Sequence, residues 1–510
     1  MAINQLKAGA LLSYLVLGVS NIVGLLYTPY MLRMMGKSEY GLYALVGSVI
    51  AYLTILDFGF GNAIIRYTAK FRAEGKLEEQ NSMFGLFIIL YSIIGLLSFL
   101  IGLVLYFNVE YLFGETMSLD ELGKAKIMML LMVFNIAFTF PLSIFGSIIS
   151  AYENFVFVKV VALSRIILNT LIMILLLEIG YRAIGMVVLA TILNLLTLAI
   201  NFWYCKSKIK IKVSFKNMQL GLLKEISIYS FYIFLIIIID KVYWSTGQFI
   251  LGMYIGTAAV AVFAVAIQFQ GMFMGMSLAI SGVFLPKVTR MITKLNNEVE
   301  ISNLFIRTGR IQFIIIAFIL SGFLLFGKQF IVLWAGPDYR EAYSITVLFF
   351  IALSIPLIQT LGMTILQARN QMKFRSWLYF FMAIVSLIMQ FILVKKYGGI
   401  GVAYAISGAL ILGNVFIMNI YYHKKQALNM IKFWTEILKM AVVPFVIAVI
   451  THLSLMNFNL NTPVKLFYGI VIYSVIYLPL FWFISMNSYE RELILNPIRR
   501  LTLKKINTKN

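Results

Sequence analysis

The chain has 510 residues, of which 61% are hydrophobic and only 12% are charged, and its mean hydropathy is +0.93. This composition excludes a soluble globular protein, because so apolar a chain must be solvated by lipid. The 42 Lys and Arg residues exceed the 20 Asp and Glu residues and give a net charge of +22. One cysteine, Cys205, and two histidines, His423 and His452, are too few for a disulfide framework or a Cys/His metal site.

Apolar runs recur along the chain, and each is long enough for a helix to cross a hydrocarbon core of about 30 Å. The first run follows a lone Lys7 and has no small-residue cleavage site after it, so we interpret it as an uncleaved span. Together the runs predict an all-α polytopic membrane protein with about fourteen transmembrane helices. The predicted spans are residues 8–32, 40–65, 82–107, 125–150, 160–178, 185–205, 226–250, 258–285, 303–327, 342–368, 376–394, 400–422, 437–454 and 465–485.

The distribution of Lys and Arg predicts the orientation of these spans. With the N-terminus inside, 31 of the 42 basic residues lie in or beside inner segments, 10 lie in or beside outer segments, and Lys241 lies within a span. Basic residues accumulate on the cytoplasmic side of membrane proteins. We therefore expect both termini to be cytoplasmic.

The excess of positive charge is accounted for by topology and by contact with anionic lipids of the inner leaflet, and no nucleic-acid partner is expected. The segment Lys206–Lys216 alternates lysine with apolar residues, which is typical of a segment that lies along the headgroups. We expect the same of the basic tail, which contains Arg499, Arg500, Lys504 and Lys505.

The two halves of the chain resemble each other at an offset of about 216 to 220 residues. Gly36 in the turn between spans 1 and 2 is matched by Gly256 between spans 7 and 8, and Pro141 is matched by Pro356. Further matched pairs are Gly146 with Gly362, Asn154 with Asn370, and Gly185 with Gly401. Such parallel repeats place a substrate path between two lobes that rock about it, although gene duplication without transport would leave the same pattern.

The repeat predicts two pseudo-symmetric six-helix bundles, because an even number of helices in each copy returns the chain to the same side. We expect an N-lobe at 1–205, a basic cytoplasmic linker at 206–225, a C-lobe at 226–422, two extra C-terminal helices at 423–485 and a basic cytoplasmic tail at 486–510.

The end of span 2 carries a distinctive motif. Residues 56–67 read Leu-Asp-Phe-Gly-Phe-Gly-Asn-Ala-Ile-Ile-Arg-Tyr, and a Gly-x-x-x-x-Gly-Leu-Tyr turn begins at Gly36. With the plan of six, six and two helices, this sequence resembles the Wzx-type polysaccharide-biosynthesis flippases of the multidrug/oligosaccharidyl-lipid/polysaccharide (MOP) exporter superfamily. The resemblance covers essentially the whole chain.

This resemblance implies a MATE/MurJ-like fold with two lobes in a V and a lateral opening near spans 1 and 8. It also implies a flippase that carries an undecaprenyl-pyrophosphate-linked oligosaccharide from the inner to the outer leaflet of a bacterial inner membrane. Such a protein would act in surface polysaccharide biosynthesis, including lipopolysaccharide, beside polysaccharide polymerase machinery.

Ionisable residues within the spans are the first candidates for function, because a charge at the centre of a membrane helix costs about 2.5 to 3.5 kcal/mol. Asp57 is a candidate for coupling to Na⁺ or H⁺, or else is bonded to nearby backbone or to Arg66. Asp240 is a second coupling candidate, and Lys241 is a candidate ligand for a diphosphate. Alternatively, Asp240 and Lys241 form static pairs with groups on other helices.

Further candidates for the substrate cavity carry cationic or amide groups. Arg307 and Arg310 lie three apart in span 9, and Arg165 and Asn169 lie four apart in span 5, so each pair shares a helix face. Arginine suits phosphate oxygens, but near a helix end it also snorkels to headgroups. Gln268 and Gln270 in span 8 would bond sugar hydroxyls, or else would link helices.

Two other functions fit the same composition. An ion-coupled drug/cation antiporter of the same superfamily would favour acidic residues in its cavity, so a net-basic cavity would argue against it. A membrane enzyme acting on lipid-linked glycans would need a substantial outer loop, and the longest predicted one runs only from Asn108 to Lys124. We therefore expect a transporter without a catalytic site or a cofactor.

Overall fold

The structure is a computed structural model of the chain, and it describes residues 5–216, 218, 220–281, 288, 290–292, 297–455, 460–493 and 495–496. Of the predicted tail at 486–510, Arg499, Arg500, Lys504 and Lys505 lie outside the described residues. The chain packs as two units, with Met1–Ala264 and Tyr379–Ala405 in unit 1 and Val265–Leu378 and Ile406–Asn510 in unit 2.

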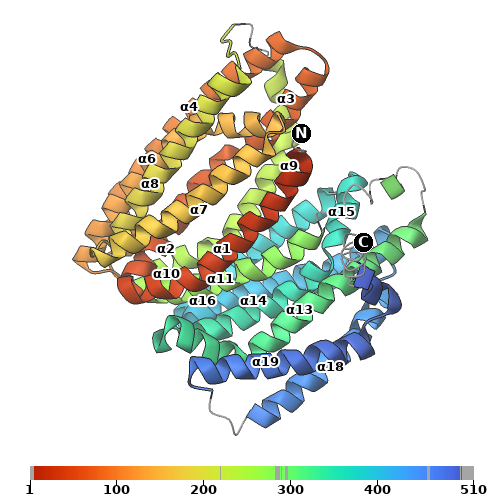
Figure 1. Cartoon of the computed structure of the whole chain (residues 1–510). Helices are drawn as coiled ribbons and strands as arrows, with labels where there is room; N and C mark the ends of the chain where they lie inside the picture. Colours follow the sequence, from red (N-terminus) through yellow and green to blue (C-terminus); the bar gives the residue numbers. More distant parts are fainter. Residues whose placement is uncertain are drawn as a thin grey trace, which may run out of the picture. The chain divides into compact units, whose positions relative to one another are not determined.

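The elements of unit 1 are α-helices with short irregular turns between them (Figure 1). They are α1 (Gln5–Met35), α2 (Lys37–Leu53), the 3-10 turn η1 (Thr54–Asp57), α3 (Phe60–Ala73), α4 (Leu77–Phe107), α5 (Val109–Phe113), α6 (Leu119–Ala151), α7 (Phe155–Glu178), α8 (Ala183–Tyr204), the π-turn η2 (Cys205–Ile209), α9 (Leu220–Trp244) and α10 (Thr246–Tyr254).

Two helices contribute to both units, and the remainder belong to unit 2. The shared helices are α11 (Thr257–Ser281) and α16 (Lys373–Ile411). Those of unit 2 are α13 (Glu298–Ala335), η4 (Pro337–Tyr339), α14 (Glu341–Ile358), α15 (Thr360–Ala368), η5 (Leu412–Met418), α17 (Asn419–Lys425), α18 (Met430–Leu455), α19 (Pro463–Leu480) and η6 (Phe481–Ser485).

Within the described residues, 13 helical segments are long and apolar enough to cross a membrane. The segment Lys373–Lys425, of 53 residues, covers two predicted spans at once. Its helix is interrupted at Gly398, where the backbone leaves the helical region (φ 55°, ψ −134°). Counting the two sides of this interruption separately, each predicted span has a helical counterpart, so the prediction of an all-helical polytopic membrane protein is confirmed.

Unit 1 is built around α6, which packs against α2, α3, α4, α5, α7 and α8. Figure 1 shows α4, α6 and α8 running side by side. Small residues allow the close approach: a Cβ atom at Gly95 of α4 would lie 2.5 Å from the carbonyl oxygen of Ala137 of α6. Without water between helices, such close packing is a main source of helix association in lipid.

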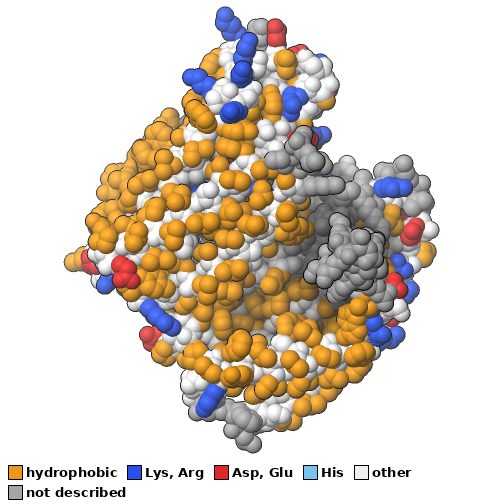
Figure 2. All heavy atoms as spheres, viewed as in Figure 1, with side chains coloured by type: hydrophobic (Ala, Val, Ile, Leu, Met, Phe, Trp, Pro, Cys, Tyr) orange, Lys and Arg blue, Asp and Glu red, His pale blue; other side chains and the backbone are white. Residues whose placement is uncertain are grey.

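The flank of unit 1 faces its surroundings with apolar side chains. Leu11, Leu26, Leu171 and Leu175 are more than half exposed on α1 and α7, and Figure 2 shows a hydrophobic surface over these helices with charged side chains gathered at their ends. Exposed leucine of this extent is unfavourable in water and favourable in hydrocarbon. The chain is therefore a multi-pass membrane protein.

The basic segment Lys206–Lys216 lies against the beginning of α4. The Ser214 amide donates to the carbonyl oxygen of Asn81 (3.0 Å), and the Ser82 hydroxyl donates to that of Lys216 (2.9 Å). The lysines of this segment are exposed, and Lys and Arg gather at this end of unit 1 in Figure 2. The predicted contact of these lysines with anionic headgroups stays a prediction.

In unit 2, α13 is the central helix and packs against α14, α15, α18 and α19. The predicted extra pair, α18 and α19, is attached to it through a buried cluster that contains Phe326, Met440 and Tyr473. Inside this cluster the hydroxyl groups of Ser321 and Tyr473 lie 2.6 Å apart.

The predicted repeat has local counterparts in the backbone. Gly36 and Gly256 each stand directly before a helix. Both have a positive φ, of 81° and 113°, which is a conformation that favours glycine. Pro141 and Pro356 both lie inside helices. The units nevertheless divide the chain differently from the predicted lobes, because α9 and α10 pack with helices of the first repeat. The lobe boundaries stay a prediction.

Candidate functional site

The second span is broken in the middle by the sequence motif noted above. After α2 ends at Leu53, the backbone tightens into η1 and then takes the left-handed conformation at Phe58 (φ 50°) and Gly59 (φ 73°) before α3 begins. Irregular backbone at membrane depth is tolerated only where protein buries it or where it lines a cavity. The break is therefore a candidate site.

The seventh span is broken as well. Helix α9 ends at Trp244 and α10 begins at Thr246. The Thr246 hydroxyl donates to the Lys241 carbonyl oxygen (3.3 Å) and accepts from the Tyr52 hydroxyl (2.5 Å), so this break is tied to α2. Discontinuous helices of this kind form the substrate and ion sites of many transporters.

The two broken spans lie directly against each other. A Cβ atom at Gly59 would overlap the side chain of Ile233 on α9, and the rings of Phe58 and Phe234 lie 4.8 Å apart between their centres. Glycine at position 59 therefore has two functions: it adopts the left-handed backbone without strain, and its lack of a side chain leaves room for α9. We call this contact the α3–α9 seam.

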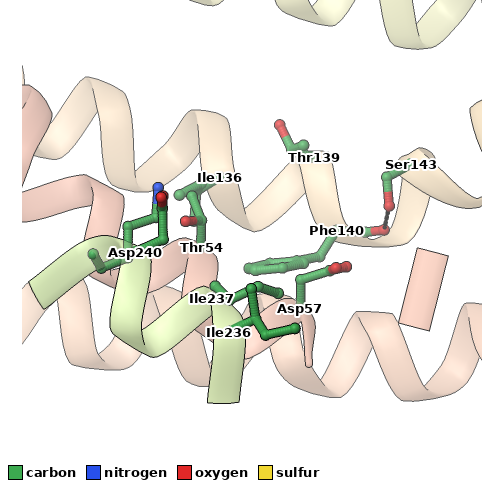
Figure 3. Close-up of a pocket in the computed structure, with 10 residues that line it drawn as sticks. Thr54, Asp57, Ile136, Thr139, Phe140, Ser143, Ile236, Ile237 and Asp240 are labelled. Carbon is green, nitrogen blue, oxygen red and sulfur yellow. Dashed lines mark hydrogen bonds between the residues drawn. The ribbon is translucent and has the colours of Figure 1, made fainter. Parts of the chain in front are cut away.

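Beside the breaks lies a cavity of about 470 Å³, here called the polar cavity (Figure 3). It is lined from η1, α6 and α9 by Thr54, Asp57, Ile136, Thr139, Phe140, Ser143, Ile236, Ile237, Asp240 and Lys241. Figure 3 shows Asp57 and Asp240 at different ends of it, with Phe140 and Ile237 between them. The three charged residues predicted from the sequence thus share one cavity.

Asp57 is held in place by two donors. The Tyr91 hydroxyl on α4 donates to its carboxylate over 2.7 Å, and the Gly59 amide donates as well. Tyr91 itself is only 1% exposed, and Ser143 of α6 is hydrogen-bonded to it. The carboxylate is therefore oriented by α4 and by the backbone turn that follows Asp57. The Gly59 bond is the backbone bonding that the sequence analysis gave as one alternative.

Asp240 and Lys241 are adjacent on α9, and Asp240 is the more exposed of the two. Their charges interact, but neither forms an ion pair with a residue of another helix in the described part of the chain. The described residues therefore contain no static ion pair between Asp240 or Lys241 and another helix. Both side chains stay accessible to a molecule in the polar cavity.

A chain of polar side chains leads from Arg165 to the polar cavity. The guanidinium group on α7 donates to the Asn194 side-chain oxygen on α8 (3.2 Å). The Asn194 amide in turn donates to Thr139 and to Asn135 on α6, each over 2.7 Å. Arg165 therefore acts on the cavity wall through Asn194. Its predicted neighbour Asn169 is half-buried on α7 and is absent from the described lining residues.

The remaining candidates belong to unit 2. Gln270 is buried on α11 and its amide lies against the Met274 sulfur of the same helix, while Gln268, two residues before it, is half-buried. The roles of both glutamines in substrate binding stay predictions.

Arg310 is engaged by protein groups. Its guanidinium donates to Glu490 over 2.5 and 3.0 Å, to Glu436 over 2.7 Å, and to the Ser485 carbonyl oxygen over 3.2 Å. The guanidinium nitrogens are occupied by two carboxylates of the protein. This geometry differs from both expected roles of Arg310, phosphate binding and snorkelling to headgroups. Arg307 is exposed on the same helix and lies over the Tyr489 ring at 5.1 Å, and both of its expected roles stay predictions.

Sequence reasoning missed the hydroxyl groups of the site. Thr139 and Ser143 lie four apart on α6, so they share a face, and this spacing of polar residues in an apolar span is a usable signal. Tyr91 carries no such signal, since tyrosine is common in membrane helices.

The described lining of the polar cavity contains two carboxylates and one ammonium group. Of the candidates for the substrate cavity named from the sequence, Lys241 is the one among these described lining residues. The predicted arginines Arg165, Arg307 and Arg310 are absent from this lining, whereas both predicted acids, Asp57 and Asp240, belong to it.

A model of the polysaccharide biosynthesis protein family matches residues 6–292, more than half of the chain. The chain belongs to this family. The match confirms the resemblance drawn from the motif at Leu56–Tyr67 and from the helix plan. No curated protein matches the sequence of this family member.

Solved structures of MOP superfamily transporters share the fold of this polysaccharide biosynthesis protein. The lipid II flippase MurJ, in an inward closed conformation, is 19% identical with a TM-score of 0.71, and the match covers 95% of this chain and 99% of that one. An inward-facing MATE family multidrug resistance transporter is 16% identical with a TM-score of 0.60, covering 79% and 99%.

A MOP superfamily transporter from Pyrococcus furiosus is 14% identical with a TM-score of 0.55, covering 82% of this chain and 95% of that one. At such low identities these similarities establish the fold alone. They confirm the predicted MATE/MurJ-like architecture of the polysaccharide biosynthesis protein.

Proposed function

We propose that this protein is a flippase that moves an undecaprenyl-pyrophosphate-linked oligosaccharide from the inner to the outer leaflet of a bacterial inner membrane. Membership of the polysaccharide biosynthesis family is the observation that carries the proposal. A polar cavity within spans 2, 4 and 7 supports it. We place both termini in the cytoplasm and expect polysaccharide polymerase machinery to use the product.

A flippase is needed because a diphosphate sugar carries charge and many hydroxyl groups. Unaided passage through hydrocarbon would remove its hydrogen bonds with water, at a cost of several kcal/mol for each polar group. A polar cavity that opens to one side at a time replaces these bonds.

The residues of the polar cavity divide this task by their chemistry. Lys241 supplies a point charge for the diphosphate. The carboxylates of Asp57 and Asp240 accept hydrogen bonds from sugar hydroxyl groups, and charge-assisted bonds of this type are stronger than neutral ones. An acidic cavity is thus compatible with a sugar as cargo.

We further propose that transport is coupled to Na⁺ or H⁺ through Asp57 or Asp240. A carboxylate inside a membrane is a common site for ion coupling. Of the titratable groups near Asp57, Tyr91 of α4 is hydrogen-bonded to it, and Asp240 and Lys241 of α9 line the same cavity at its other end, while α6 contributes the hydroxyl groups of Thr139 and Ser143.

The test of the flippase is transport of a fluorescent lipid-linked oligosaccharide in reconstituted vesicles, with Lys241→Met compared with wild type. We expect the rate to fall by about tenfold or more, because removing a charge-assisted contact costs about 1.5–3 kcal/mol. Lys465→Met, an exposed lysine at the start of α19, serves as the matched control and should keep the wild-type rate. Absence of lipid-linked sugar transport by the wild type would refute the proposal.

A cation antiporter of the same superfamily is the second candidate, and the two carboxylates of the polar cavity favour it. In the same vesicles a cationic dye distinguishes the two. Dye exchange that is driven by an ion gradient, without movement of the lipid-linked sugar, would replace the flippase by the antiporter.

A further inference from the structure

A second hollow of about 430 Å³ lies on the other side of the α3–α9 seam, here called the apolar groove. It is lined by Phe58 and Phe60 of the broken span, by one face of α4 that includes Ile93 and Leu97, and by Phe231 and Phe234 of α9. Among its described lining residues, the side-chain polar group comes from Ser230. The groove therefore suits a hydrocarbon chain.

The apolar groove and the polar cavity are built from the same two segments. Asp57 lines the cavity and the next residue, Phe58, lines the groove. On α9, Asp240 and Ile237 face the cavity, whereas Phe234 faces the groove. Polar and apolar spaces thus lie on the two sides of one broken helix. An amphiphile would match this arrangement, with its headgroup on the polar side and its tail on the apolar side.

The groove is open at the protein surface. The side chains of Ile93, Leu97 and Phe231 are 52%, 49% and 45% exposed. These residues lie within α4 and α9, at positions inside membrane-spanning helices or next to them. A chain that lies in the groove therefore remains within the hydrocarbon layer and need not enter the polar cavity.

We propose that the apolar groove holds the polyprenyl tail of the lipid-linked substrate while its diphosphate sugar occupies the polar cavity. This inference rests on the proposed function and adds to it a tail site on spans 2, 3 and 7. It differs from the lateral opening near spans 1 and 8 that the family resemblance implies. The occupant is selected by adjacency, because Asp57 lines the polar cavity and the next residue, Phe58, lines the apolar groove.

The α3–α9 seam then acts as the partition between tail and headgroup. The contact of Gly59 with Ile233 and the pairing of Phe58 with Phe234 close the path between the two spaces. Passage of the headgroup from the groove side into the cavity would require this seam to part.

The test is photo-crosslinking of the full-length protein in nanodiscs of phosphatidylethanolamine and phosphatidylglycerol. The probe is polyprenyl phosphate with a diazirine on its tail, and peptide mapping locates the products. We expect labelling of residues 90–97 and 230–234 to exceed the labelling by a phospholipid with a diazirine on its acyl chain. Equal labelling by the two probes would overturn the inference, because the groove would then hold bulk lipid.

The second part of the test fills the apolar groove with a larger side chain. Leu97→Trp should lower polyprenyl labelling of residues 230–234 by about fivefold, since over-filling a packed space excludes its occupant. Leu96→Trp is the control, because Leu96 is 60% exposed on the same helix and does not line the groove. Undiminished labelling in correctly folded Leu97→Trp would also overturn the tail site.

The two proposals fail separately in these experiments. Lipid-linked sugar transport by the wild type without preferential polyprenyl labelling refutes the groove and keeps the flippase. Preferential labelling that Leu97→Trp abolishes, in a protein that moves no lipid-linked sugar, keeps a polyprenyl site and refutes the flippase.

Discussion

Asp57 is the residue at which sequence and structure agree most closely. It stands in the family motif, it ends the 3-10 turn of a broken span, and its carboxylate lines the polar cavity while Tyr91 and Gly59 orient it. A carboxylate fixed in this way retains free lone pairs on the cavity side, because two donors satisfy only part of its capacity of about four.

The coupling role of Asp57 predicts a change in pH dependence. Asparagine at this position keeps the shape and removes the titrating group, so Asp57→Asn should slow transport and flatten its dependence on pH. The measurement is the transport rate in vesicles between about pH 5 and 8, a range in which proton-coupled carriers respond. Asp120→Asn, at a carboxylate that is 73% exposed, should keep the wild-type profile.

The same comparison made with Asp240→Asn identifies which carboxylate is involved. If both variants retain the wild-type rate and pH profile, neither acid couples transport to protons. A response to the Na⁺ gradient that persists at constant pH and is lost in one variant would assign that carboxylate to Na⁺.

At the scale of elements, Arg310 connects α13 to the two C-terminal helices. Its guanidinium is 7% exposed and Glu490 is 1% exposed, so the pair is removed from solvent. The same guanidinium also contacts α18 through Glu436 and the end of η6 through the Ser485 carbonyl oxygen. The arginine that was expected to bind substrate thus has a packing role, fixing how the appended pair sits on unit 2.

Arg310→Met should lower the thermal stability of the protein in detergent, because breaking a buried pair by removing one partner costs about 3–5 kcal/mol. The loss should be partly restored when Glu436→Gln and Glu490→Gln are added, since no buried charge is then left uncompensated. Arg307→Met removes an exposed arginine from the same helix and should change the melting temperature little. Equal stability of Arg310→Met and wild type would contradict the role of the cluster.

At the scale of the whole molecule, alternating access requires the two repeats to meet and part. Within unit 1, helices of the first repeat already contact the start of the second. Glu121 of α6 accepts from Thr257 of α11 over 2.7 Å and also from Ser38, and Thr116 donates to the Gly252 carbonyl oxygen over 2.5 Å. These residues lie at the ends of spans predicted to face outward.

Gly41 of α2 is the tightest point of this contact. A Cβ atom there would overlap the Thr257 carbonyl group, whereas one at Gly47 of the same helix would meet open space. Gly41→Val should therefore force α2 from α11, raise amide hydrogen exchange in residues 257–261 and slow transport. Gly47→Val carries the same change of helix propensity and should leave the exchange of these amides unaltered. Wild-type exchange in Gly41→Val would mean that the close approach at Gly41 does not hold α2 against α11.

The sequence alone predicted the features that depend on local composition. Each span was recognised from its own apolar run, because transfer of a helix into hydrocarbon depends on the residues of that helix. The pair at Gly36 and Gly256 marked the repeat, and the stretch at Leu56–Tyr67 indicated the family. Asp57, Asp240 and Lys241 were singled out because an ionised side chain is expensive anywhere in a span.

What only the tertiary structure decided is which of these residues meet. A run of apolar residues does not record which face of its helix touches which neighbour, since lipid and protein are equally apolar surroundings. The sequence therefore could not foresee that Glu436 and Glu490 would neutralise Arg310, that Tyr91 would orient Asp57, or that Asn194 would link Arg165 to the cavity wall. These contacts join helices far apart in the chain, and packing of the folded helices is the physical cause that selects them.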